Sequence, residues 1–275
     1  RDDPIAKDPA VHDVILAVGT RLQFPELIGG QQVIQIDVDP EELGRNYDNT
    51  FEINGDARVS LDMLYGVLSA QTAPRSDRRS AVEAIRASRR EVAIRVEPQE
   101  SYMAAVRAAV PDDGILVAGM TQLGYYSRSY FPVYQPQSFL TSSYFGNLGY
   151  AYPTALGAKV AQPDKAVVAL SGDGGFLFNS QELATAVKYG INAVVVVFND
   201  NAFGNVYRDQ ALKFEGRTIG SDLYNPDFMK LAEAYGARGI LARGPEALEK
   251  ALREALGIAA PTLIEVPVGM MPIPF

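Results

Sequence analysis

Two short polar segments have the residue types needed to hold a metal ion beside an anion. They are Ser-Gly-Asp-Gly-Gly at residues 171–175 and Asn-Asp-Asn at residues 199–201, and each directly follows an apolar run. If those runs are neighbouring parallel strands, their ends lie at one edge of the sheet, which brings Asp173 and Asp200 close together. Mg²⁺ prefers such carboxylates, with phosphate oxygens and water completing its octahedron. Glycines let a phosphate approach backbone N–H groups. The sequence therefore predicts a magnesium–diphosphate site.

Other interpretations of these segments explain less. A lone Gly-Asp-Gly is usually only a turn, but a second acidic segment at the end of the next strand makes the pattern more specific. A calcium-binding loop at residues 199–210 fails, because Phe203 stands where a ligand is needed and Gln210 replaces the bidentate glutamate.

Composition excludes several classes of function. The 275 residues are 47% hydrophobic and 21% charged, as is usual for a globular protein with a substantial core. The formal net charge of -8 would repel a nucleic acid or an anionic membrane surface, so neither is expected as a partner. The chain has no cysteine, which excludes disulfides, thiolate nucleophiles and cysteine–zinc sites and fits a cytoplasmic location.

The elements that must position the polar segments alternate between strands and helices. From residue 98 onward, we expect strands at 115–118, 166–170, 193–198, 238–241 and 262–266. The helices expected between them are 102–110, 154–161, 179–189, 226–235 and 245–256, with Asn179 and Glu182 forming a capping box at the third. This alternation predicts an α/β fold with a doubly wound, mostly parallel sheet.

A smaller α/β unit precedes this one. Strands at 13–18 and 33–38 and a helix at 60–68 predict a Rossmann-like α/β unit over residues 1–72, which the resemblance described below implies to be part of a middle domain. Residues 73–97 are polar and rich in arginine, and we interpret them as a solvated connecting helix rather than as a binding patch. The larger domain then spans residues 98–275.

The sequence resembles one family over nearly its whole length. The two polar segments resemble the fingerprint of thiamine-diphosphate (ThDP) enzymes, a Gly-Asp-Gly followed by Asn-Asn. Residues 146–158, 179–186 and 37–44 resemble segments of the acetolactate-synthase-like and 2-oxo acid decarboxylase branch, the last of them from its middle domain. The resemblance implies a ThDP diphosphate-binding domain preceded by part of the middle domain.

The resemblance also implies how the metal ion is held. Asp173 and Asp200 would ligate Mg²⁺ with their side chains, and Ala202 would ligate it with its backbone carbonyl. Asp200 departs from the family's pattern, in which asparagine is usual at this position. Aspartate is still a good oxygen ligand, but it adds a charge near the metal.

Further residues would hold the cofactor itself. By resemblance, Leu148 would lie beneath ThDP and force its two rings into a V shape, and the carbonyl of Gly146 would accept from its 4′-amino group. The remaining expected cofactor contacts are Thr121 or Gln122, which would touch the diphosphate, together with Gly172, Gly174, Gly175 and Asn205. For Asn205 and Tyr207, an ordinary helix face remains an equal alternative.

The implied activity is decarboxylation or carboligation of 2-oxo acids through an enamine intermediate. In this branch the glutamate that activates the cofactor lies in an N-terminal pyrimidine-binding domain, and no segment here resembles that domain. We therefore name no catalytic acid–base residue and expect the chain alone to be inactive. The expected partners are a 2-oxo acid and that domain, from the same or another chain, within a homodimer or homotetramer.

Several alternatives accompany this prediction. FAD is not expected, because residues 19–24 depart from the Arg-Phe-Asp-Asp run of flavin-containing relatives, although Asp37 or Asp39 could bind a ribose hydroxyl. A nicotinamide-dependent dehydrogenase would need Gly-x-Gly-x-x-Gly, which neither glycine cluster matches. A non-catalytic regulatory module that keeps the fold remains open. The tyrosine-rich residues 125–131 indicate packing or a subunit contact, and Phe176 and Phe178 are expected in the core.

Overall fold

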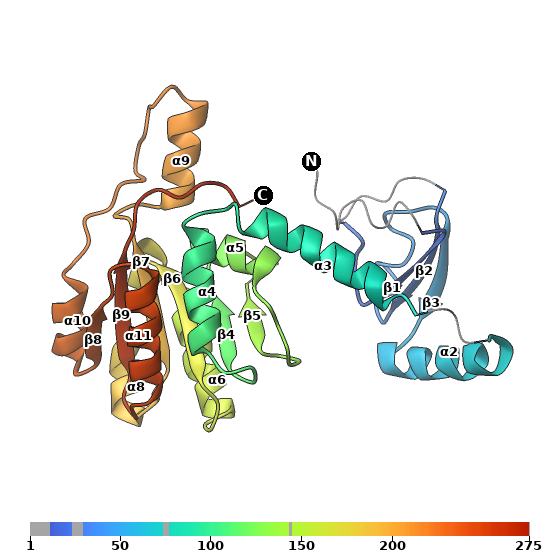
Figure 1. Cartoon of the computed structure of the whole chain (residues 1–275), viewed down its shortest axis with the longest axis horizontal. Helices are drawn as coiled ribbons and strands as arrows, with labels where there is room; N and C mark the ends of the chain where they lie inside the picture. Colours follow the sequence, from blue (N-terminus) through green and yellow to red (C-terminus); the bar gives the residue numbers. More distant parts are fainter. Residues whose placement is uncertain (1–11, 24–29, 74–76, 143–144, 275) are drawn as a thin grey trace. The chain divides into compact units, whose positions relative to one another are not determined.

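The structure is a computed structural model that describes residues 12–23, 30–73, 77–142 and 145–274. The chain divides into two compact units, residues 1–92 and residues 93–275, which are described one at a time (Figure 1). Among the described residues, no helix is long and apolar enough to cross a lipid bilayer.

In the described part of the first unit, three parallel strands form a sheet of order β1-β2-β3. Its elements are β1 (Val14–Val18), β2 (Gln32–Asp37), β3 (Thr50–Asn54), α2 (Ala57–Gln71) and α3 (Arg79–Ala93). Helix α2 begins at Asp56, whose side chain accepts the backbone N–H of Val59 as an N-cap should. Strand β3 escapes sequence analysis because most of its residues are exposed, so it forms no apolar run.

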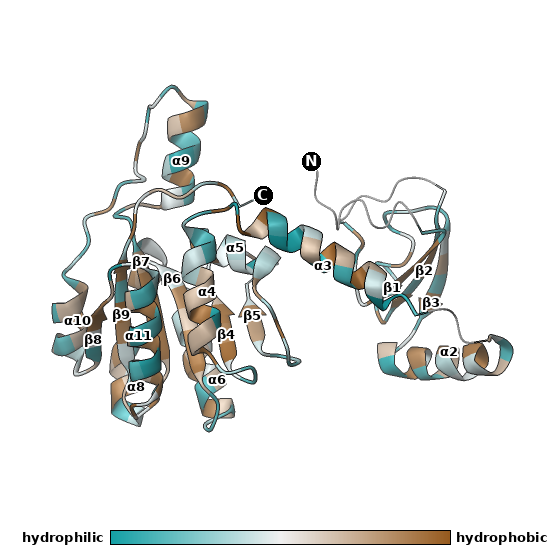
Figure 2. Ribbon diagram, in the orientation of Figure 1, coloured by the Kyte–Doolittle hydropathy of each residue, from teal (hydrophilic) through white to brown (hydrophobic). Residues whose placement is uncertain are grey.

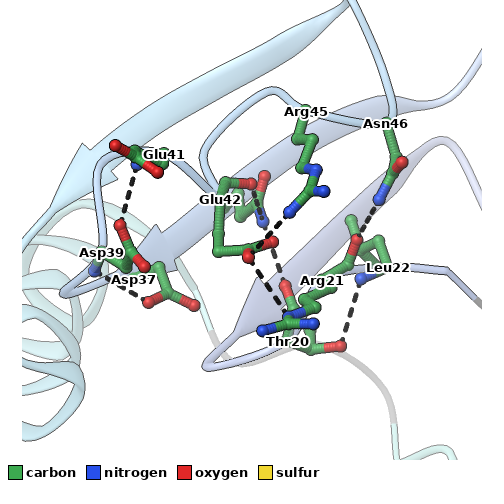
Figure 3. Close-up of polar contacts among 10 residues, drawn as sticks. Thr20, Arg21, Leu22, Asp37, Asp39, Glu41, Glu42, Arg45 and Asn46 are labelled. Carbon is green, nitrogen blue, oxygen red and sulfur yellow. Dashed lines mark hydrogen bonds and ion pairs between the residues drawn. The ribbon is translucent and has the colours of Figure 1, made fainter.

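The loop after β2 is held by charged side chains of its own and by Arg21 from the segment after β1 (Figure 3). Glu42 lies between two guanidinium groups, 3.2 Å from Nε of Arg21 and 2.9 Å from Nη1 of Arg45. Asp37 accepts the backbone N–H of Asp39 at 3.0 Å, and Asp39 accepts a backbone N–H further along the loop. The two aspartates considered for a ribose hydroxyl therefore each use one carboxylate oxygen to hold the turn.

The second unit is a doubly wound α/β fold. Its described residues form a six-stranded sheet of order β5-β4-β6-β7-β9-β8, in which every pairing is parallel. The strands are β4 (Ile115–Ala118), β5 (Phe139–Thr141), β6 (Val167–Gly172), β7 (Val194–Asn199), β8 (Arg238–Leu241) and β9 (Thr262–Pro267). The helices are α4 (Gln99–Ala109), α5 (Gln122–Tyr130), α6 (Ala151–Ala161), α7 (Asp173–Leu177), α8 (Glu182–Tyr189), α9 (Gly204–Lys213), α10 (Phe228–Tyr235) and α11 (Pro245–Leu256). The α/β prediction is confirmed.

Both faces of this sheet are covered, so its central strands are hydrophobic throughout (Figure 2). In β7, Val194 and Val196 face a core shared with α4, α5 and α11. Val195 and Val197 face a second core, shared with α6, α8 and α10. Burial on both faces explains why the strand reads as an unbroken apolar run, and it leaves only the strand ends for polar chemistry.

The structure contradicts one local prediction, confirms another in part and supports a third. The capping box at Asn179 is wrong: α8 begins at Glu182, and Asn179 instead donates from Nδ2 to the carbonyl of Gly149 at 2.7 Å. Phe176 is in the core as expected, but Phe178 is 58% exposed. Within the tyrosine-rich stretch, Tyr126 is fully buried, which supports the packing interpretation there.

Candidate functional site

The two polar segments leave the sheet side by side. Strands β6 and β7 are neighbours, with Gly172 opposite Phe198 in the register, so both strands end at one edge. Asp173 comes directly after β6 as the first residue of α7 and is only 1% exposed. Asp200 comes directly after β7. Burial and the nearby charge of Asp173 raise the pKa of Asp200 to about 6, as two carboxylates that share a buried site should.

A pocket of about 310 Å³ opens at this edge. Every residue expected at the metal or the cofactor lines it: Thr121, Gln122, Gly146, Leu148, Gly172, Asp173, Gly174, Gly175, Asp200, Ala202 and Asn205. Sequence analysis missed most of its apolar wall, which includes Met120, Phe203, Val206, Val268 and Met271. Val206 lies in the first turn of α9, and the others come from loops or from the chain after β9, where no periodic pattern marks them.

Asp200 is held by neighbours on both carboxylate oxygens. Gln122 donates from Nε2 to Oδ2 at 2.7 Å, and the backbone N–H of Ala202 donates to Oδ1 at 3.3 Å. Gly204 packs closely against this carboxylate, because a Cβ added to it would lie 2.3 Å from Oδ2 of Asp200. The carboxylate is therefore fixed in direction before any ligand arrives.

Asp173 is held by an asparagine that sequence analysis missed. Asn225 donates from Nδ2 to Oδ2 of Asp173 at 2.6 Å, and the same group lies 2.8 Å from Oδ1 of Asn199. Burial raises the pKa of Asp173, while the hydrogen bonds from Asn225 and from backbone N–H groups oppose that shift. Asn225 lies in the loop before α10, not at a strand end, so its position in the sequence gives no signal.

The glycines after Asp173 serve close packing. A Cβ on Gly174 would lie 2.5 Å from Cε1 of Phe203 and 2.9 Å from Cδ1 of Leu223. A Cβ on Gly175 would lie 3.8 Å from Cδ2 of Leu148. Both glycines lie in the first turn of α7, where backbone N–H groups have no partner within the helix and can face an anion.

The remaining expected residues are also placed at the pocket. Gly146 has a φ of 65°, a backbone conformation that glycine adopts without strain. Thr121 is buried and is the N-cap residue of α5, and Leu148 is half-buried. Asn205 lines the pocket from the first turn of α9, whereas Tyr207 lines a neighbouring cavity.

These residues fit a magnesium–diphosphate group. Within the described ranges, no cluster of three or more His, Cys, Asp or Glu side chains offers a complete metal cage. Asp173 is buried and Asp200 is partly buried, and the charge of Asp173 makes Asp200 harder to ionise. A cation would offset this repulsion, and phosphate, water and a backbone carbonyl can complete its octahedron.

Comparisons with known proteins agree with this chemistry. The profile of the thiamine pyrophosphate enzyme C-terminal TPP binding domain matches residues 119–266, and that of the central domain matches residues 4–64. A probable acetolactate synthase large subunit from Methanococcus aeolicus is 31% identical over 92% of this chain and 46% of the relative. A probable 2-ketoarginine decarboxylase from Pseudomonas aeruginosa is 33% identical over 92% of this chain and 46% of its own length.

A solved structure is similar as well. The thiamine diphosphate-dependent 4-hydroxybenzoylformate decarboxylase of Rhodococcus jostii RHA1 superposes with a TM-score of 0.75 at 27% identity, covering 97% of this chain and 50% of that one. The chain thus spans about half the length of the curated relatives that it matches. Because the C-terminal profile alone covers more than half of the chain and includes both acidic segments, the chain belongs to the thiamine pyrophosphate enzyme family.

Proposed function

We propose that the pocket binds the diphosphate of ThDP together with Mg²⁺, as part of an enzyme that acts on 2-oxo acids. The observation that carries this proposal is the convergence of Asp173 and Asp200 at the ends of adjacent strands, in a pocket lined by every expected cofactor residue. The C-terminal TPP binding domain that matches residues 119–266 supports the choice of cofactor.

Each group in the pocket has a role in this proposal. Asp173, Asp200 and the carbonyl of Ala202 would hold the metal ion, and the first-turn N–H groups of α7 would meet the diphosphate. Leu148 would support the cofactor from below. ThDP supplies the electron sink needed to cleave the bond beside the carbonyl of a 2-oxo acid. The apolar residues around the mouth, such as Val206 and Met271, would limit the access of water.

The relatives support the substrate class that we propose. They include acetolactate synthases and decarboxylases, which supports decarboxylation or carboligation of a 2-oxo acid. We expect an N-terminal pyrimidine-binding domain, from the same or another chain of a homodimer or homotetramer, to supply the activating glutamate. We also expect a cytoplasmic location, and no FAD on the first unit.

Calorimetric titration of ThDP in the presence of Mg²⁺ tests the site. Asp173→Ala should abolish magnesium-dependent binding, because one carboxylate cannot neutralise the metal–diphosphate group as two can. Asp112→Ala is the matched control, since its side chain is 79% exposed in the loop before β4. Unchanged affinity in Asp173→Ala would show that the metal is held elsewhere.

A further inference from the structure

Arg208 is a buried cation beside the pocket, and it belongs to none of the roles assigned so far. It lies in α9 and is only 8% exposed. Within the described ranges, no Asp or Glu lies within ion-pair distance of its guanidinium, and its Nε–H has no acceptor. Burying a charge without a partner of opposite sign is costly, so the contacts that Arg208 does make need an explanation.

Arg208 contacts three acceptors, and one of them is the side-chain amide of Gln122. Nη1 of Arg208 lies 3.3 Å from Oε1 of Gln122 and donates to the carbonyl of Met271 at 2.9 Å. The backbone N–H of Met271 also donates to Oε1 of Gln122, at 2.9 Å. Nη2 of Arg208 donates to Oδ1 of Asn205 at 2.8 Å. The oxygen end of the Gln122 amide therefore receives two donors.

The opposite end of that amide faces the proposed metal site. Nε2 of Gln122 donates to Oδ2 of Asp200 at 2.7 Å. A glutamine amide can turn over and exchange its oxygen and nitrogen. With two donors fixed on Oε1, only one orientation keeps an N–H on Asp200, and the turned orientation would set an oxygen against a carboxylate. A cation on Oε1 also polarises the amide and strengthens its N–H as a donor.

We propose that Arg208 is a positioning residue of the metal site, which acts through Gln122 to hold the carboxylate of Asp200. This inference rests on the function proposed above. Arg208 touches neither the metal nor the cofactor in this arrangement. Its guanidinium fixes the orientation of the Gln122 amide, and the amide fixes the orientation of the Asp200 carboxylate. The carboxylate oxygens would therefore point at the metal ion in one orientation.

A purely structural role predicts something different. Arg208 also holds the Met271 carbonyl and Asn205, so its loss could lower stability in general. In that case its effect on metal affinity would be independent of Gln122. If it acts through Gln122, then Arg208 has no influence on Asp200 in a variant that already lacks the glutamine side chain. A double-mutant cycle separates these two cases.

The measurement is the affinity of the chain for Mn²⁺ at saturating ThDP, followed by electron paramagnetic resonance. Arg208→Met keeps the length of the side chain and removes its donors, and we expect metal affinity to fall by about 10- to 100-fold. Gln122→Ala should cause a similar loss, and adding Arg208→Met to it should cause no further loss. Lys213→Met is the matched control, since it removes an exposed cation from the same helix and should leave affinity unchanged.

Two results would overturn the proposal: wild-type affinity in Arg208→Met, or losses that multiply in the double variant. If Arg208→Met does not fold by circular dichroism, Arg208→Lys decides instead. Its single ammonium cannot span the same acceptors, so an intermediate affinity supports positioning and wild-type affinity contradicts it. Asp173→Ala separates the two claims. If Asp173→Ala loses metal binding but the Arg208 variants keep it, only the positioning role of Arg208 is contradicted. If the wild-type chain does not bind Mn²⁺ and ThDP, the proposed function is contradicted as well.

Discussion

Asp173 and Asp200 lie together in a largely buried corner, where burial raises the pKa of both carboxyl groups and the charge of Asp173 raises that of Asp200 further. The pKa of Asp200 is raised to about 6, first by burial and then by the charge of Asp173. A raised carboxyl pKa means that the folded state binds this proton more tightly than the unfolded state does. The folded chain without metal therefore loses stability as the pH rises through about 6, and it recovers that stability when a cation binds.

Replacing Asp200 by asparagine tests how much stability the folded chain loses when this carboxyl ionises. In magnesium-free buffer at pH 8, Asp200→Asn should raise the free energy of unfolding by about 1 to 2 kcal/mol. This is less than the free energy that corresponds to the whole pKa shift of Asp200, because its carboxyl is only partly buried and solvent screens its charge. At pH 5 the difference should shrink, since the wild-type carboxyl is then largely protonated.

Thermal unfolding at both pH values measures the effect, and metal affinity should change little because an amide oxygen can still ligate. Glu215→Gln, on an exposed side chain after α9, is the control for charge alone. Equal stability of Asp200→Asn and wild type at pH 8 would argue against repulsion between the two aspartates.

At the residue scale, the pattern of strands pairs the two aspartates, the resemblance adds residues elsewhere such as Leu148, and both miss Asn225 and Arg208. Asp173 and Asp200 could be paired because parallel strands end at one edge, whatever the detail of the fold. Asn225 and Arg208 come from a loop and from the inside of a helix, where a polar residue is ordinarily a solvated one. Only the packing of α9 and of the loop before α10 over the sheet edge brings them to the site.

At the scale of elements, agreement is best where the local signal is strong. Strand β4 and helix α11 match their expected bounds, because the first is an apolar run and the second has a proline at its start. Strand β8 also matches, although only two of its four residues have apolar side chains. For helix α5 the sequence predicts no element. Its sequence, Gln-Leu-Gly-Tyr-Tyr-Ser-Arg-Ser-Tyr, holds a glycine and two serines, so tertiary packing rather than propensity stabilises it.

The short helix α7 allows a prediction about its glycines. Gly174→Ala would place a methyl group 2.5 Å from the ring of Phe203, so the ring must move or the helix must shift. We expect a loss of about 1 to 3 kcal/mol in unfolding free energy and weaker diphosphate binding.

The matched control is Gly157→Ala in α6, where no atom lies within 4 Å of the added Cβ. That change should be neutral or stabilise the chain by up to about 1 kcal/mol, because alanine is the better helix former. Chemical denaturation of both variants gives the comparison, and equal stabilities would mean that Phe203 accommodates the methyl group freely.

At the scale of the whole molecule, the pocket serves only one end of the proposed cofactor. The pocket carries the residues expected for the metal and the diphosphate, and the relatives that match it are about twice as long. We expect this chain with ThDP and Mg²⁺ to be silent toward a panel of 2-oxo acids, because the resemblance assigns the group that activates the pyrimidine ring to an N-terminal pyrimidine-binding domain.

Adding the N-terminal pyrimidine-binding domain in trans should restore turnover of a 2-oxo acid, measured as release of CO₂ or as consumption of the acid. The same addition to Asp173→Ala should restore nothing, which controls for activity carried by the added domain. Robust turnover by the chain alone would place the activating group within residues 1–275.

Strand β7 has one more property that bears on how the sheet is assembled. Its valines offer the same side chain to both faces, so a slip of one residue would exchange the faces and still bury valine on each of them. Hydrophobicity alone therefore does not align this strand with its neighbours. The alignment depends on its polar end, where Asn199 donates to Oε1 of Glu265 and accepts from Asn225, each at 2.8 Å. The polar cluster at the proposed metal site thus also sets the register of β7. A shift of one residue in that register would move Asp200 away from Asp173 by the rise of one residue.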